Sequence, residues 1–172
     1  MESSIQNIEL HYNGRKVKGK RVVVRSIIER PIKNVWKKLL QSQTLEYVAK
    51  GLMKFKPLNG EFPKVWEVDT VVQTKVFLFH FIPMGGIHSI EFAKIDSNEF
   101  QIQTFEQNTS AKIWNHTMDL TAVNEKQTSY KDEIDVYCGF LTPIMARSVL
   151  LLYKYRRKRW GRMLNDKNIK EV

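Results

Sequence analysis

Glu106, His116 and Asp132 are the side chains of this sequence whose type and position could do chemistry. Each shares the strand parity of apolar residues, as His116 does with Trp114 and Met118. Because alternate residues of a strand point to the same side of a sheet, all three are expected on one apolar face. Carboxylates and an imidazole with pKa values tuned by burial could then serve as a general acid and base. The alternative is that neighbouring groups or ordered water satisfy them in a wet cavity.

The hairpin connections predict how these residues pair across the sheet. Glu106 is expected opposite about Trp114, with His116 one residue pair further along, so that the two lie about 5–8 Å apart as a diagonal pair. Asp132 is expected opposite about Met118, or two residues beyond it, which places it about 7–13 Å from His116 at about 3.3 Å per residue. The pattern therefore predicts a contact between Glu106 and His116 but no tight triad with Asp132.

Metal ligands and known catalytic motifs are scarce in the sequence. His88 shares the parity of Ile90 and Phe92 and could join His116 and a carboxylate around a metal, but no ligand spacing supports this. Cys138 is the single cysteine, which excludes an intrachain disulfide and most cysteine-based zinc sites. The sequence contains no Gly-x-Ser-x-Gly, phosphate-loop or dinucleotide-binding motif. We therefore expect neither a metal nor another cofactor.

Aromatic and methionine residues with the same parity indicate a pocket for an apolar molecule. Such side chains also fill ordinary cores, and in a partly hollow fold the two roles overlap. We expect a bound ligand to contact the following residues: Trp36, Phe77, Phe79, His88, Ile90, Phe92, Ile102, Trp114, Met118, Tyr130, Asp132, Met145, Val149, Leu152 and Tyr153.

The elements that must position these residues form one α+β domain. Strands are predicted at 15–28, 65–82, 87–96, 100–107, 113–123 and 130–138. Residues 8–12 are expected to pair back on the first of these strands. Pro31 begins a short helix, and Thr44 and Gly51 delimit a second one. Short polar or Gly-rich connections join the later strands, so antiparallel neighbours with one buried face are expected.

A helix of about 23 residues, from Thr142 to Leu164, is the clearest element. Thr142 and the proline after it are good first residues of a helix. The first half, through Leu152, is almost entirely apolar, and residues 153–160 combine aromatic and basic side chains. We expect the first half to lie deep against the sheet and the second half to emerge from it. An aspartate at Leu151 or Leu152 would then be buried and destabilising.

This order of elements is that of the helix-grip fold, and four segments strengthen the likeness. They are Val22-Val23-Val24 with Pro31…Val35-Trp36, Trp114-Asn115-His116-Thr117-Met118, Tyr130-Lys131-Asp132-Glu133-Ile134-Asp135-Val136…Gly139-Phe140-Leu141-Thr142-Pro143, and Tyr153…Arg156-Arg157…Arg159-Trp160. On these segments, residues 21–164 resemble a bacterial member of the START-related, birch-pollen-allergen-like superfamily (SRPBCC, polyketide cyclase and ligand-transport type). The resemblance implies an antiparallel sheet of about seven strands wrapped around a long C-terminal helix, with two short helices after the first strand and an apolar cavity inside.

Members of this superfamily bind lipids, sterols, hormones or polyketide intermediates, a few catalyse cyclisation or hydrolysis, and others remodel partner proteins. The resemblance therefore implies that the chain binds a small hydrophobic, lipid- or polyketide-like molecule in the cavity. One alternative is a cyclase- or hydrolase-like enzyme that uses Glu106 and His116 as an acid–base pair. Another is an adaptor that contacts a partner protein or a membrane surface through the basic C-terminal helix. The enzyme needs its polar groups clustered in the cavity, and the adaptor needs a projecting basic half-helix.

Length and charge set the remaining expectations. The 172 residues predict a single ligand-binding domain with its core at 21–164, an extension at 1–20 and a tail at 165–172. No secretory signal and no run of 18 apolar residues is present, so a cytoplasmic location is expected. The net charge is +10, and residues 139–172 hold nine Lys/Arg against two acids. Such a run is most often a solvated face. Nucleic acid is not an expected partner, whereas a weak contact with an anionic membrane surface stays open.

Overall fold

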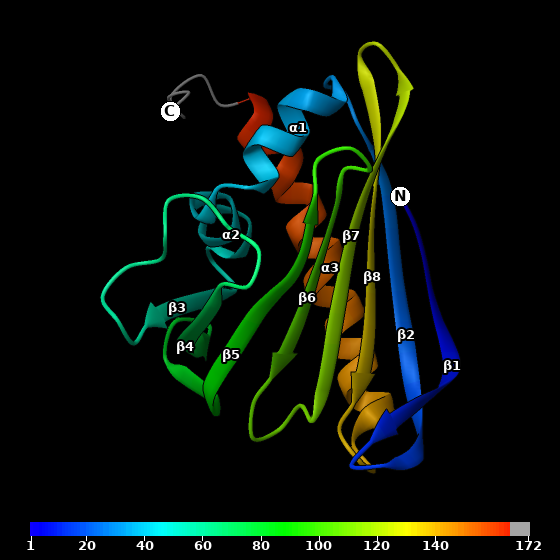
Figure 1. Cartoon of the computed structure of the whole chain (residues 1–172), viewed down its shortest axis with the longest axis vertical. Coiled ribbons are helices and arrows are strands. Elements are labelled where there is room, and N and C mark those ends of the chain that lie inside the picture. Colours follow the sequence, from blue (N-terminus) through cyan, green and yellow to red (C-terminus); the bar gives the residue numbers. More distant parts are fainter. Residues whose placement is uncertain (166–172) are drawn as a thin grey trace.

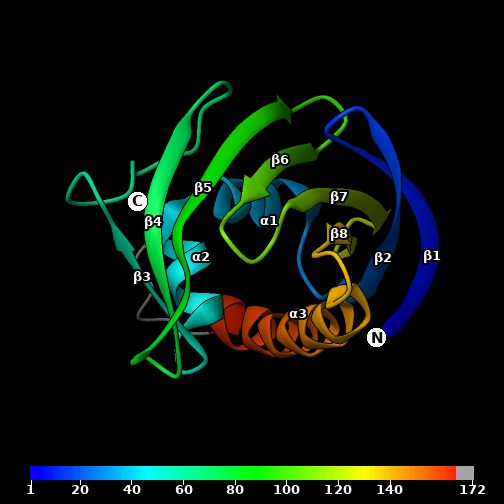
Figure 2. The same ribbon diagram turned by 90° about the horizontal axis from the view of Figure 1, so that it is seen from below.

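Eight antiparallel strands form one sheet that curves around the C-terminal helix (Figure 1, Figure 2). The computed structural model describes residues 1–165, so the tail expected at 165–172 lies outside them apart from Asn165. The strands are β1 (Glu2–Tyr12), β2 (Arg15–Ile28), β3 (Met53–Pro57), β4 (Val71–Leu78), β5 (Ile82–Asp96), β6 (Gln101–Gln107), β7 (Ile113–Asn124) and β8 (Gln127–Tyr137). Their order across the sheet is β1-β2-β8-β7-β6-β5-β4-β3. The antiparallel helix-grip architecture expected from the sequence is confirmed.

The strands have one buried and one wet face, as the alternation predicts. In β8 every second residue is buried, including Tyr130, Asp132 and Ile134, and the residues between them are partly exposed. β7 pairs with β8 so that His116 opposes Ile134. Because side chains of one parity point to one side of a sheet, these buried residues form the concave face that meets α3 (Thr142–Asn165).

The sheet differs from the expected seven strands at its two edges. β1 pairs with β2 along its whole length, so the N-terminal extension is a full strand rather than a short one at 8–12. The stretch 65–82, expected as a single strand, is strand only from Val71 to Leu78 before a turn. β3 is not predicted because its five residues, Met-Lys-Phe-Lys-Pro, are too few to establish an alternation.

Two short helices, α1 (Ile32–Leu39) and α2 (Ser42–Ala49), connect β2 to β3. Gly51, at φ +93°, lets the chain turn away after α2. The Tyr155 hydroxyl of α3 donates a hydrogen bond to the Lys50 carbonyl at 2.7 Å, and a Cβ at Gly51 would collide with that hydroxyl. Glycine is therefore required here for both its backbone freedom and its size, and the turn fastens α2 to α3.

Both halves of α3 contribute buried side chains to the core. Ala146, Val149 and Tyr153 are buried in the apolar part, and Trp160 and Met163 in the basic part. These residues are three, four or seven positions apart, which is the spacing of one side of a helix. The expectation that the second half emerges from the sheet is therefore wrong, because the buried stripe continues into it.

The opposite side of α3 is exposed even where it is apolar. Ile144 and Leu151 are 62% and 68% exposed, although both lie in the apolar first half, whereas Leu152 packs against the core. The expected burial of Leu151 is wrong because a helix can turn only one side toward a sheet. Within residues 1–165, no helix is both long and apolar enough to cross a membrane.

Two apolar clusters fill the space between the concave face and the helices. In the first, Trp66 stacks on Phe92 with ring centroids 4.5 Å apart, and Trp160 of α3 packs edge-on against Tyr130. The second surrounds Val149 where α3 crosses β2 and β8, and it includes the following residues: Val22, Val24, Ile134, Val136, Ala146 and Tyr153. On β8, only Asp132 separates the residues of the two clusters.

Replacing Val149 by aspartate should lower the free energy of unfolding by more than about 3 kcal/mol, because the charge would be buried without a partner. The matched control is Leu151→Asp, two residues along the same helix on its exposed side. It should change the free energy of unfolding by less than about 0.5 kcal/mol. Urea unfolding followed by circular dichroism measures both values. Similar losses at the two positions would contradict the orientation of α3.

Candidate functional site

A row of polar side chains, here called the polar belt, crosses the concave face between the two apolar clusters. Each strand from β4 to β8 contributes at least one member, so the row is continuous across five strands. The members are Thr74, His88, Thr104, Glu106, His116 and Asp132. They are buried or nearly so, and buried polar groups are stable only when they find hydrogen-bond partners.

One end of the polar belt centres on Glu106. Its carboxylate accepts a hydrogen bond from the Thr104 hydroxyl at 2.9 Å and lies 2.8 Å from Nε2 of His88. The side-chain oxygen of Asn108 accepts from two backbone N–H groups, so its amide nitrogen donates to Nδ1 of His88 at 3.2 Å. Nε2 of His88 therefore carries the proton that Glu106 accepts. Burial disfavours the charged carboxylate, but these hydrogen bonds and the nearby imidazoles outweigh burial and lower the pKa of Glu106.

The other end of the polar belt centres on Asp132. Nε2 of His116 lies 2.8 Å from Oδ1, and Nη2 of Arg157 in α3 donates to Oδ2. Burial opposes ionisation of Asp132, yet the charge of Arg157 and the hydrogen bond from His116 lower its pKa to about 2. The Tyr153 hydroxyl lies 3.2 Å from Nδ1 of His116, and burial raises the pKa of Tyr153. Tyr153 is therefore a neutral donor to Nδ1, and Nε2–H points to Asp132.

The strand pairing matches the sequence expectation, but the contacts differ from it. Glu106 opposes Trp114, and Asp132 opposes Met118. His116 lies 2.8 Å from Asp132 and 3.9 Å from Glu106, so the contact that the pattern excludes is the tighter of the two. The expected distances follow from backbone positions along the strands and take no account of side-chain length. Side chains of this length lean along the strand and close the diagonal.

Two contacts of the polar belt are not predicted from the sequence. Arg157 reaches Asp132 from α3, although the basic run around it predicts a solvated face. Its place four residues after Tyr153, on the buried stripe, is the signal that could have found it. His88 is expected to contact the bound molecule and is considered as a metal ligand, whereas it pairs with Glu106 across β5 and β6. Among the described residues, no three His, Cys, Asp or Glu side chains are arranged to hold a metal ion.

Several buried donor atoms beside the polar belt have no hydrogen-bond partner among the described residues. They are Nε1 of Trp114, the hydroxyl of Tyr130, and Nε and Nη1 of Arg157. Burial raises the pKa of Tyr130, so its hydroxyl keeps its proton. A buried polar group left without a partner costs about 1–3 kcal/mol. The Arg157 guanidinium lies over the Tyr130 ring, 3.1 Å from its centroid, so the ring face meets part of its demand. An acceptor such as a carboxylate or carbonyl oxygen would satisfy the remaining donors.

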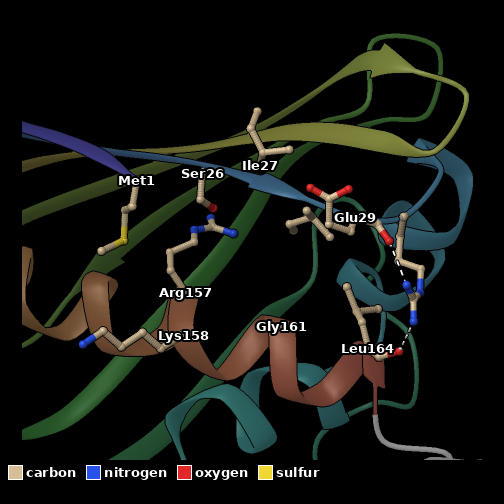
Figure 3. A pocket seen from close by; sticks show the side chains of 10 residues that line it. Met1, Ser26, Ile27, Glu29, Arg157, Lys158, Gly161 and Leu164 are labelled. Atoms are coloured by element: carbon tan, nitrogen blue, oxygen red, sulfur yellow. Dashed lines mark hydrogen bonds between the residues drawn. The ribbon is translucent and has the colours of Figure 1, made fainter.

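A cleft of about 420 Å³ opens beside Arg157, between β2 and the C-terminal half of α3. Met1, Ile28 and Leu164 contribute to its apolar lining. Figure 3 shows Arg157 extending from α3 toward Ser26 of β2. The polar belt and the two apolar clusters lie between the concave face and the helices, the region where the sequence predicts an apolar cavity. The sequence carries no local signal for this cleft, because it forms where three distant segments meet.

Most residues expected to contact a ligand lie inside the fold, but Phe77 and Phe79 do not. Those that are buried or partly buried are Trp36, His88, Ile90, Phe92, Ile102, Trp114, Met118, Tyr130, Asp132, Met145, Val149, Leu152 and Tyr153. In β4 the buried parity belongs to Thr74 and its alternate neighbours, so Phe77 lies on the outer face, 5.2 Å from the Lys56 ammonium. Phe79 is exposed in the turn after β4. The expected interior positions of Phe77 and Phe79 are therefore wrong, because the parity of β4 turns Phe77 outward and Phe79 lies beyond the end of the strand.

Comparison with known proteins finds the fold and no relative in sequence. No protein-family model matches the chain, and no curated protein matches it. CalU16 from Micromonospora echinospora has a TM-score of 0.62 at 9% identity, covering 94% of this chain and 85% of its own. Norcoclaurine synthase from Thalictrum flavum, in complex with dopamine and hydroxybenzaldehyde, has a TM-score of 0.65 at 7% identity, with 88% and 90% covered. A START superfamily protein from Mycobacterium smegmatis has a TM-score of 0.61 at 10% identity, with 84% and 97% covered.

These similarities show that the chain has the helix-grip fold of these proteins. The resemblance that the sequence segments carry is thereby confirmed for the fold. One fold hosts many activities, so the function of this chain has to be argued from its own site.

Acid should destabilise the protein through Asp132. Its pKa is about 2 in the folded protein and 3.8 ordinarily, so its stabilising effect is complete above the ordinary value and is lost as the pH falls through about 2. The difference corresponds to roughly 2 kcal/mol. Urea unfolding of Asp132→Asn across this pH range should show a pH dependence smaller by about that amount.

At neutral pH the same variant should lose roughly 3–5 kcal/mol, because Arg157 would be buried without a counter-charge. The control is Asp135→Asn on the outer face, where the carboxylate lies 2.7 Å from partly exposed Arg21. That variant should lose less than about 1 kcal/mol. Equal losses in the two variants would show that Asp132 and Arg157 are not paired in the interior.

Proposed function

We propose that this protein binds a small amphiphilic molecule, lipid- or polyketide-like, between β2 and α3, with an acceptor group of the ligand on Arg157. The observation that carries the proposal is that Arg157 has two unpaired guanidinium nitrogens and also lines an apolar cleft. A guanidinium presents donors in a planar fork that fits a carboxylate, and such charge-assisted hydrogen bonds are strong. Nη2 would stay on Asp132 while the ligand takes the free donors.

The size and lining of the cleft fit such a ligand. Small-molecule sites typically measure about 300–1,000 Å³, and this cleft measures about 420 Å³. Met1, Ile28 and Leu164 would contact the hydrocarbon, and Lys158 adds a second cation at the rim of the cleft. The norcoclaurine synthase of the same fold is described with two small aromatic molecules, which supports small-molecule binding by this architecture.

A second candidate function is a cyclase- or hydrolase-like enzyme that acts on the bound molecule. His116 is the observation in its favour, because Asp132 orients its Nε2–H and the Tyr153 hydroxyl faces its Nδ1. A carboxylate, an imidazole and a hydroxyl in sequence form an arrangement suited to proton transfer. Glu106, the partner expected from the sequence, would add a second carboxylate at 3.9 Å. Conversion of a co-purified molecule by the wild-type protein, followed by mass spectrometry, would distinguish an enzyme from a binding protein.

Filling the cleft at Gly161 should abolish binding without harming the fold. Gly161 lines the cleft, and a Cβ placed there meets no heavy atom within 4 Å. The leucine side chain of Gly161→Leu should therefore occupy the cleft. It should weaken the binding of anilinonaphthalene sulfonate, an anion with apolar aromatic rings, by at least about tenfold. Fluorescence titration should give saturation at about one equivalent for the wild-type protein.

Gly161→Ala is the matched control, since a single methyl group leaves most of the cleft open. Both variants should be more stable than the wild-type protein by up to about 1 kcal/mol, because glycine disfavours a helix interior. Weaker binding in the leucine variant would then not reflect unfolding. Undiminished probe binding by a folded Gly161→Leu protein would refute the proposed site.

A further inference from the structure

The side of α3 that faces away from the sheet is open to solvent. Figure 2 shows the curved sheet open on one side and α3 lying along that opening, with no described element over its outer surface. Six residues at helical spacing, here called the outer stripe, make up this surface: Ile144, Arg147, Leu151, Lys154, Lys158 and Arg162. Successive members are three or four residues apart, so the outer stripe follows one side of the helix for roughly 27 Å.

Large apolar side chains are exposed at the N-terminal end of the outer stripe. Ile144 and Leu151 belong to it, and Phe140, two residues before α3, is 90% exposed. Leu141 beside it is exposed as well. Several large apolar groups exposed near one end of a helix are unfavourable in water and indicate a surface that contacts something else. These four residues therefore form an apolar end of the outer stripe that the fold itself leaves uncovered.

Cations without counter-ions accompany the apolar end. α3 contains seven Lys or Arg residues and no Asp or Glu. Inward-facing cations are used within the fold, as Arg157 is by Asp132. Arg147, Lys158 and Arg162, in contrast, are exposed and form no ion pair with another described residue. The outer stripe therefore presents uncompensated positive charge together with hydrocarbon.

We propose that the outer stripe and Phe140 dock the protein on an anionic phospholipid bilayer, with α3 parallel to the membrane plane. Helices that combine Lys/Arg with exposed Phe or Leu bind at the boundary between headgroups and acyl chains. The cations would pair with lipid phosphates, and Phe140 and Leu151 would enter the hydrocarbon. The net charge of +10 favours the same surface at longer range.

A nucleic acid would match the positive charge but not the apolar groups. Phosphate backbones are bound by cations and polar side chains, and they offer no hydrocarbon to bury Phe140, Ile144 and Leu151. The observations therefore favour lipid. Docking on lipid does not require the ligand site at Arg157, although Lys158 borders both surfaces. Failure of one proposal would leave the other intact, because vesicle binding and probe binding are measured separately.

Sedimentation of the full chain with vesicles tests this inference. We expect binding to vesicles of phosphatidylcholine mixed with phosphatidylglycerol, and much weaker binding to phosphatidylcholine alone or at high salt. The double variant Phe140→Ser/Leu151→Ser should reduce the partition coefficient at least about tenfold. Arg147→Gln/Arg162→Gln should reduce it by roughly tenfold as well. All four positions are exposed, so thermal melting should remain that of the wild-type protein.

Two control variants make the same chemical changes elsewhere on the surface. Phe81→Ser/Phe105→Ser removes two exposed rings from β5, β6 and their turns, and Lys54→Gln/Lys75→Gln removes two exposed cations from β3 and β4. Both should bind vesicles as the wild-type protein does. Loss of binding in the controls, or unchanged binding in the outer-stripe variants, would overturn the inference. Binding to duplex DNA or RNA without binding to vesicles would also overturn it.

Discussion

The pairing of Asp132 with Arg157 is the constraint on which the packing of the molecule depends. Leaving either charge buried alone would cost roughly 3–5 kcal/mol, so Arg157 has to face the sheet where β8 presents Asp132. This requirement fixes the rotation of α3 about its own axis. Tyr153 then meets His116 with ring centroids 5.0 Å apart, and Trp160 meets Tyr130 at 5.4 Å. The same rotation turns Leu151 to the outside.

The polar belt makes the interior different from a simple apolar container. It runs between two apolar clusters, and its carboxylates are held in their charged form by imidazoles, hydroxyls and one guanidinium. A guanidinium has five donors, and Asp132 takes only Nη2 of Arg157. Arg157 also lines the cleft, so in the proposed function the residue that orients the helix is the one that binds the ligand.

Sequence reasoning succeeded where backbone geometry decides the outcome. Turn length and strand parity were sufficient to pair Glu106 with Trp114 and Asp132 with Met118. They could not decide which diagonal contact closes, because that depends on side-chain length and lean. The run Leu150-Leu151-Leu152 has no periodicity that reveals the buried side of α3, so the exposure of Leu151 could not be predicted from it. The cleft was equally hidden, because its walls come from opposite ends of the chain.

The place of β2 in the sheet has a consequence for how the chain folds. β2 lies between β1, its neighbour in sequence, and β8, so that Arg21 pairs with Asp135 at a separation of 114 residues. During synthesis at about 5–20 residues per second, the edge of β2 that pairs with β8 would stay unpaired for roughly 6–20 s. Pairings of such long range also slow folding. β2 is rich in Lys and Arg, and charged side chains of this kind keep an open strand edge from pairing with other chains. The basic composition of β2 is therefore suited to keeping the nascent chain from aggregating until β8 has been synthesised.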